Sequence, residues 1–170
     1  VPADVTVAAE REALVAITLK RFGRIDALIN NAGYGQRGPL ELVPMDALRR
    51  NYEVNVFAVV ALSQKVAPHL RAQGHGRIIN IGSVNAYIGE PKLMAYSASK
   101  GALITLTKNT ATYLNRYRIR VNQLNVGWTD TPNEHRVKMQ EEGKGTNWLE
   151  EATLTRPFGR LLLPRDIAYA

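Results

Sequence analysis

The sequence has 170 residues, 45% of them hydrophobic, which fits one ordinary domain with a single buried core. It contains no cysteine, so disulfides and thiolate metal sites are excluded, and the cytoplasm, a reducing compartment, is the expected location. The central apolar run at 56–62 is far shorter than the ~20 residues that a membrane helix needs. We therefore expect a soluble protein with no membrane partner.

The formal net charge is +7, which could indicate a nucleic-acid surface, an acidic substrate or nothing specific. Along the sequence the basic residues are scattered. The densest groups are the pair Arg49 and Arg50 and the alternating series Arg116, Arg118 and Arg120, and neither belongs to a known nucleic-acid motif. We expect no nucleic-acid partner.

The first part of the chain predicts a helix, a strand and a second helix. Apolar residues recur at helical intervals over residues 7–22, and Gly23 ends this helix. Residues 24–30 are typical of a short buried strand, which ends in a glycine-containing turn at 32–35. After a loop, Asp46 is expected to cap the next helix.

The middle of the chain continues this alternation. A long apolar helix is predicted from 56 to about 71, a strand at 77–83, a helix at about 93–116 and a strand at 119–125. Strand and helix alternate three times, and nearly all-apolar strands indicate a sheet covered on both faces. The pattern predicts an α/β fold, a doubly wound parallel sheet with three readable central strands.

The last part of the chain, from 127 to the end, lacks a strand signal. It holds amphipathic stretches at about 134–142 and 148–154. Ligands of open α/β sheets bind beyond the carboxyl ends of the strands. We therefore interpret 127–160 as a substrate lid that belongs to the same single domain, 1–170.

Tyr96 and Lys100 lie four residues apart, in the sequence Tyr-Ser-Ala-Ser-Lys. On a helix this spacing stacks both side chains on one face. A phenol ionises near pH ~10 when unperturbed, so a tyrosine that exchanges protons at neutral pH needs a nearby cation. The pair therefore predicts an acid/base centre, whereas the intervening Ser97 and Ser99 are interpreted as bystanders.

Polar or glycine-containing segments follow each of the three predicted strands: Asn30-Asn31-Ala32-Gly33, then Ser83, then Asn125-Val126-Gly127. The carboxyl ends of parallel strands face one crevice. Together with Tyr96 and Lys100, this combination resembles the short-chain dehydrogenase/reductase family over almost the whole chain. The resemblance implies a Rossmann-like fold and an NAD(P)-dependent oxidoreductase.

The resemblance implies a catalytic group of four residues. Tyr96 would exchange a proton with the substrate oxygen, and Lys100 would favour the phenolate and hydrogen-bond the nicotinamide ribose. Ser83 would orient the substrate oxygen. Asn55 would bend the long helix and hold a water that relays protons from Lys100.

The same resemblance implies the residues that bind NAD or NADP. The cofactor set consists of Asp4, Val5, Asn31, Ala32, Gly33, Tyr96, Lys100, Gly127, Thr129 and Thr131. Val126 stands where the family usually has proline, so the turn at Gly127 is expected to be altered.

The family's first strand, with its glycine-rich turn for the pyrophosphate, has no counterpart in this sequence. The family's last helix and strand are also missing. We expect the sequence to be a portion of a longer polypeptide. The residue that selects NAD or NADP would lie in the missing N-terminal part, so the sequence does not predict the choice.

The expected reaction interconverts a secondary alcohol and a ketone on a small metabolite, a sugar or polyol ahead of a 3-oxoacyl compound. The alternative is an inactive nucleotide-sensing or scaffold protein of the same fold. No metal site is expected, because His69, His75 and His135 are widely spaced. By resemblance, the helices at 56–71 and 93–116 would pair copies into a homodimer or homotetramer.

Overall fold

The computed structural model describes residues 1–170 and divides them into two compact units, Val1–Asn125 and Val126–Ala170. The division falls next to residue 127, where the sequence predicts that the substrate region begins. None of the helices is both long and apolar enough to cross a bilayer.

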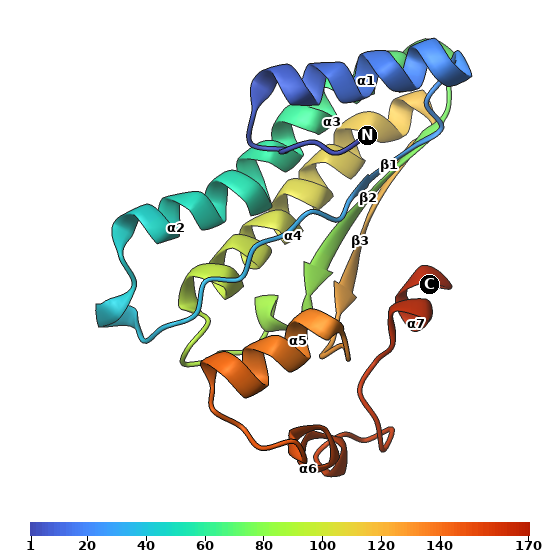
Figure 1. The fold of residues 1–170 in the computed structure, drawn as a ribbon. Coiled ribbons are helices and arrows are strands. Elements are labelled where there is room, and N and C mark those ends of the chain that lie inside the picture. Colours follow the sequence, from blue (N-terminus) through green and yellow to red (C-terminus); the bar gives the residue numbers. More distant parts are fainter. The chain divides into compact units, whose positions relative to one another are not determined.

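The sheet has three strands, β1 (Ala27–Asn30), β2 (Gly76–Ser83) and β3 (Ile119–Val126), and β2 lies in the middle. β1 and β2 pair in parallel, with Asn30 opposite Asn80. All three strands run in the same direction (Figure 1). The predicted parallel α/β sheet, Rossmann-like and with three central strands, is confirmed.

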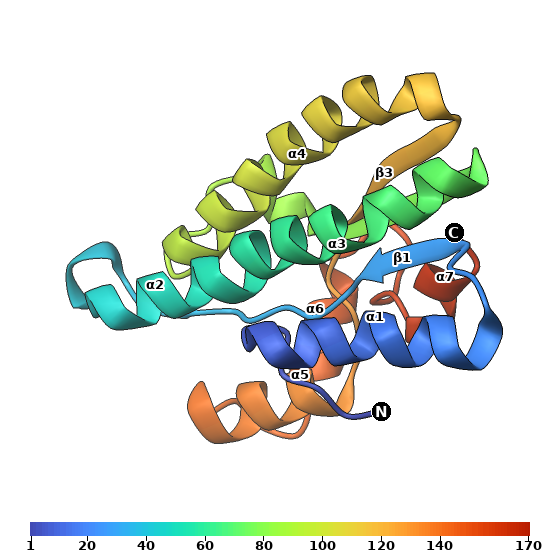
Figure 2. The same cartoon turned by 90° about the horizontal axis from the view of Figure 1, so that it is seen from above.

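The main helices of the first unit are α1 (Ala8–Phe22), α2 (Met45–Tyr52), α3 (Ala58–Gln73) and α4 (Met94–Leu114). α1, α3 and α4 lie side by side (Figure 2). Their apolar side chains and those of the strands form one core. Its buried members are Ile25, Val66, Leu70, Ile78, Leu114, Ile119 and Val121.

The helices of the first unit pack on one face of the sheet, whereas the sequence predicted helices on both. Burial alternates along β2, where Ile78 and Asn80 are buried and Arg77 is exposed. In β1, the side chain of Ile29 is 59% exposed. Successive strand residues point to opposite faces, so this alternation marks one covered face.

Two glycines end helices, and Gly23 does so as the sequence predicts. Gly23 after α1 and Gly74 after α3 have φ of 74° and 73°, the left-handed conformation that glycine adopts without strain. After α4, a short 3-10 turn, Asn115–Tyr117, leads to Arg118, which takes the same conformation with φ of 59°. Each helix of the covering layer thus turns sharply into the next strand.

The predicted cap at Asp46 is wrong. α2 begins at Met45, and Pro44 holds the N-cap position with no side-chain hydrogen bond. Asp46 lies inside the first turn, where its Oδ1 accepts a hydrogen bond from Arg49 at 2.9 Å. Proline's fixed φ already suits the entry to the helix, and an acidic group in the first turn favours the helix dipole.

The second unit consists of short helical segments. They are α5 (Pro132–Arg136), the π-turn Val137–Glu141, α6 (Trp148–Leu154) and α7 (Pro164–Ala168). Trp148 is buried among Ala152 and Leu161, with Trp128 stacked on it at 6.1 Å between ring centroids. An isolated bridge joins Thr129 to Leu162. The amphipathic stretches predicted here are helical.

Gly82 is the one strand glycine that the packing of β2 and β3 requires. A Cβ atom at Gly82 would overlap the side-chain amides of Gln123 and Asn125 on β3. These two amides hydrogen-bond each other at 2.6 Å, and Asn125 also donates to the hydroxyl of Tyr87 at 3.2 Å. The amide pair therefore lies directly against the backbone that precedes Ser83.

We expect Gly82→Ala to break this amide pair, lower the free energy of unfolding by about 1–3 kcal/mol and displace Ser83. Urea unfolding measures the effect. Gly89→Ala is the matched control, because a Cβ at Gly89 meets nothing within 4 Å and its φ is not positive. Alanine there should be neutral or stabilise the protein by up to roughly 1 kcal/mol. Equal stability of the Gly82 variant and the unaltered protein would contradict this account.

Candidate active site

The first turns of α4 place Tyr96 and Lys100 together. Lys100 is buried, 4% exposed, and its Nζ lies 5.7 Å from the centroid of the Tyr96 ring. The same Nζ donates a hydrogen bond of 2.7 Å to the carbonyl oxygen of Ile81 on β2. The geometry thus places the ammonium beside the phenol ring and ties it to the sheet.

Burial lowers the pKa of Lys100 to about 8. The cause is desolvation, because removing an ammonium from water disfavours its charged form. Its hydrogen bond to Ile81 uses one of three N–H donors. The remaining donors suit a ligand that brings oxygen atoms into the site.

Asn55 lies in a π-turn, Glu53–Phe57, between α2 and α3. It is buried, and its carboxamide pairs with both backbone groups of Tyr34. The Tyr34 N–H donates to Oδ1 at 2.9 Å, and Nδ2 donates to the Tyr34 carbonyl at 2.8 Å. The helix distortion expected at Asn55 is present, and the side chain anchors the loop that follows β1.

Asn55 also reaches α4, through Ser99. Its Nδ2 donates to Ser99 Oγ at 3.0 Å, and that hydroxyl donates to the carbonyl of Tyr96 at 2.7 Å. The interpretation of Ser99 as a bystander is therefore wrong. The spacing of Ser99 gave no signal, because its partner Asn55, in the π-turn before α3, lies far away in the sequence. The buried hydroxyl of Ser97 has no hydrogen-bond partner, and its interpretation as a bystander stays a prediction.

Gly33, in the loop after β1, borders both the Asn55 carboxamide and the Lys100 ammonium. A Cβ atom there would lie 3.7 Å from Asn55 Oδ1 and 3.7 Å from Lys100 Nζ. The segment after β1 is an irregular loop without the predicted turn, and Gly33 in this loop adjoins the buried ammonium.

Ser83 ends β2, two residues after the carbonyl that holds Lys100. It is buried, and its Oγ accepts a hydrogen bond from the N–H of Asn85 at 3.2 Å, at the start of the 3-10 turn Val84–Ala86. Ser83 therefore shares with Lys100 the carboxyl end of the central strand.

Part of the predicted cofactor set lines one hollow of about 40 Å³ at the end of β1. Val5, Asn31 and Ala32 contribute to its wall, together with apolar residues at the start of α3. Asp4 is exposed, and its Oδ1 accepts from the N–H of Thr6 at 2.8 Å, which lowers the pKa of its carboxyl group. The hollow is much smaller than a nucleotide, and the role of these residues in cofactor binding stays a prediction.

The remaining cofactor residues belong to the second unit. Thr129 Oγ1 donates to the carbonyl of Gly127 at 3.1 Å. Thr131 is the N-cap of α5, where its hydroxyl accepts from the N–H of Glu134 at 3.2 Å. These contacts define the local backbone, and the role of the three residues in cofactor binding stays a prediction.

Residues 1–142 match the short chain dehydrogenase family. L-fucose dehydrogenase of Mus musculus is 36% identical over 172 residues, and the match covers 100% of this chain and 62% of that protein. Gluconate 5-dehydrogenase of Gluconobacter oxydans is 38% identical over 146 residues, covering 86% of this chain and 55% of that protein.

Two solved structures are also similar. NAD+-bound xylitol dehydrogenase has a TM-score of 0.85 at 29% identity, covering 98% of this chain and 70% of that chain. The NADH complex of 3-ketoacyl-(acyl-carrier-protein) reductase from Brucella melitensis has a TM-score of 0.87 at 33% identity. The match covers 99% of this chain and 67% of that chain.

The chain belongs to the short-chain dehydrogenase/reductase family. It spans 62% of the length of the L-fucose dehydrogenase that it matches.

We expect Ser99→Ala to lower the free energy of unfolding by about 1 kcal/mol, because it removes the buried hydrogen bonds that the Ser99 hydroxyl makes with Asn55 and Tyr96. Ser97→Ala is the matched control. Its buried hydroxyl has no partner, so alanine should be neutral or slightly stabilising. Urea unfolding of both variants measures the difference. Equal losses would contradict the role given to Ser99.

The lowered pKa of Lys100 predicts a pH dependence of stability. Between about pH 8 and 10.5 the unfolded state holds more protons than the folded state, so the unfolding free energy rises with pH in this window. Relative to Lys100→Met, the protein with Lys100 should gain about 2 kcal/mol between about pH 7.5 and 9.5. Urea unfolding of both proteins tests this, and a difference that stays constant with pH would disprove the desolvation.

Proposed function

We propose that this protein is an NAD(P)-dependent oxidoreductase that interconverts a secondary alcohol and a ketone. The observation that carries the proposal is the buried ammonium of Lys100, 5.7 Å from the Tyr96 ring centroid and bonded to the strand that ends in Ser83. Family membership and the dehydrogenase names of the similar proteins support the reaction class.

In the oxidation direction, Tyr96 acts as the general base. Its phenolate accepts the hydroxyl proton of the substrate while the C–H bond on the same carbon breaks and releases a hydride. The nicotinamide, when bound, supplies the acceptor for that hydride. In the reverse direction, the Tyr96 hydroxyl returns the proton to the carbonyl oxygen.

The other three residues prepare this proton transfer. The positive charge of Lys100 favours the phenolate, and its spare N–H donors would bind the ribose hydroxyls of the cofactor. Ser83 would donate a hydrogen bond to the substrate oxygen. Asn55 joins the loop after β1, at Tyr34, to α4, and its π-turn is the proposed place for the water that relays protons from Lys100.

We propose a sugar or polyol as the substrate, ahead of a 3-oxoacyl compound. Similar proteins named for fucose, gluconate and xylitol support the first class, and the 3-ketoacyl reductase supports the second. Residues 127–160 would select the substrate. Polar side chains in this region suit hydroxyl groups: Asn133, His135, Gln140 and Asn147.

NAD and NADP both remain candidates for the cofactor, since the similar structures are named with NAD+, NADP or NADH. We also propose a cytoplasmic enzyme, because the sequence has no cysteine.

A homodimer or homotetramer through α3 and α4 is supported by the open space at Gly101, which would let a second helix approach closely.

We expect Tyr96→Phe in the full-length protein to lower kcat by roughly 10²–10⁴-fold while dinucleotide affinity changes little, because only the exchangeable proton is lost. Absorbance of the reduced nicotinamide measures turnover, and a fluorescence titration measures binding. Tyr113→Phe, on an exposed tyrosine of the same helix, is the control and should be neutral.

Near-normal turnover of the Tyr96 variant would refute the assignment of the acid/base. If the unaltered protein binds dinucleotide but oxidises no sugar, polyol, steroid or hydroxyacyl compound, the alternative of a nucleotide sensor holds instead.

A further inference from the structure

The net positive charge lies at one end of the first unit. Three segments that connect helices to strands, 20–26, 71–77 and 113–120, contain eight Lys and Arg residues and one acidic residue, Asp26. Their formal charge of +7 therefore equals that of the whole chain. We call these three segments together the basic edge.

The fold brings the three segments together. Each one connects the carboxyl end of a helix to the beginning of a strand, and the three strands are parallel neighbours. All three turns therefore lie at the amino end of the sheet, opposite the carboxyl ends where Ser83 and Gly33 lie. Figure 1 shows the ends of α1, α3 and α4 meeting there. Basic residues that are scattered in the sequence thus form one surface.

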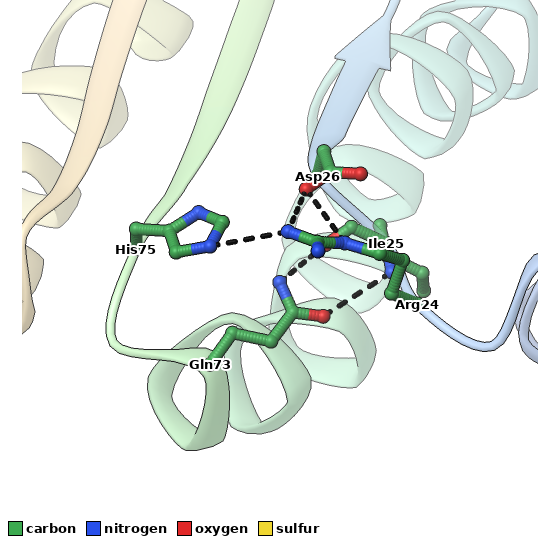
Figure 3. Close-up of polar contacts among 5 residues, drawn as sticks. All are labelled: Arg24, Ile25, Asp26, Gln73 and His75. Carbon is green, nitrogen blue, oxygen red and sulfur yellow. Dashed lines mark hydrogen bonds and ion pairs between the residues drawn. The ribbon is translucent and has the colours of Figure 1, made fainter.

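Direct contacts join the first two segments (Figure 3). Arg24 Nη2 lies 3.1 Å from His75 Nε2, and Gln73 pairs with the backbone of Ile25, donating to its carbonyl at 2.7 Å and accepting from its N–H at 3.3 Å. Arg24 also bonds Asp26 through Nε at 3.0 Å. The one carboxylate of the edge is thus already engaged.

Aromatic rings join the second and third segments. The guanidinium of Arg71 lies 4.3 Å from the centroid of the Tyr117 ring, and that of Arg116 lies 4.8 Å from the Tyr113 ring. Tyr113 remains 51% exposed. An open hollow of about 470 Å³ lies here, lined by Pro68, Arg71, Ala72 and Tyr117.

We propose that the basic edge binds single-stranded nucleic acid. Seven of its eight basic residues are arginines, whose planar fork suits phosphate oxygens. Tyrosine rings beside arginines offer bases a stacking surface, and such contacts tolerate any sequence. The proposal replaces the expectation of no nucleic-acid partner, which rested on the order of residues along the chain.

The test uses the full-length protein and a fluorescein-labelled oligonucleotide of about 20 nucleotides, with anisotropy measured between about 50 and 200 mM salt. The triple variant Arg77→Gln, Arg118→Asn and Arg120→Gln removes three exposed charges, and asparagine suits the left-handed conformation at 118. Binding should weaken roughly tenfold or more, and the log–log salt slope should fall by about 2.

The matched control removes three exposed lysines elsewhere: Lys92→Gln, Lys108→Gln and Lys144→Gln. It should keep both the affinity and the slope. Tyr113→Ala should weaken binding about fivefold or more without changing the slope, since stacking releases no counterions. Circular dichroism shows whether each variant is folded.

Three results would overturn the proposal. The first is no binding by the unaltered protein at low salt. The second is an equal loss in the two triple variants, which would show that net charge alone is responsible. The third is binding to phosphatidylserine vesicles, lost in the triple variant of the basic edge, without binding to the oligonucleotide. This result would make the basic edge a membrane-binding surface.

Discussion

The arrangement of this site depends on one side chain, the carboxamide of Asn55. Both of its polar atoms are engaged by the backbone of Tyr34, and its Nδ2 also reaches Ser99 on α4. One buried amide therefore joins the loop after β1 to the helix that carries Tyr96 and Lys100. The π-turn around Asn55 accommodates this, because it departs from regular α-helical geometry at the position where the side chain must face both partners.

The second feature is a charge held away from water. Lys100 is buried and donates a hydrogen bond to a neutral carbonyl, and desolvation lowers its pKa to about 8. Such an ammonium is unfavourable for folding, because burial removes its charge from water. Its spare donors would be satisfied once hydroxyl groups of a ligand enter. We infer that cofactor binding and activation of the tyrosine are coupled through this side chain.

The sequence predicted the local features well, since they depend on short spacing. The four-residue separation of Tyr96 and Lys100 predicted that they share one face of the helix, and Gly23 predicted the end of the first helix. Prediction from the sequence failed where contacts between residues far apart in the sequence decide the structure. Ser99 bonds a residue on a different helix, and no pattern around it shows that partner. The cap at Asp46 failed because proline, one position before the helix, already begins it.

The charge distribution shows the same limit. Residues near 20, 75 and 118 are far apart in the sequence, and only the parallel topology brings their turns to one edge. The sequence is equally uninformative about which faces of the sheet the helices cover. Apolar strands do not tell which chain segments lie on each face, so the helices of the first unit were expected on both faces and lie on one.

A double-mutant cycle between Asn55→Ala and Ser99→Ala tests the central claim most directly. If the carboxamide joins the loop to α4 through Ser99, the two changes in unfolding free energy should be non-additive by about 1 kcal/mol. A parallel cycle of Asn55→Ala with Ser97→Ala should be additive, since the Ser97 hydroxyl has no partner. Additivity in the first cycle would show that Asn55 and Ser99 act independently, and would contradict the account.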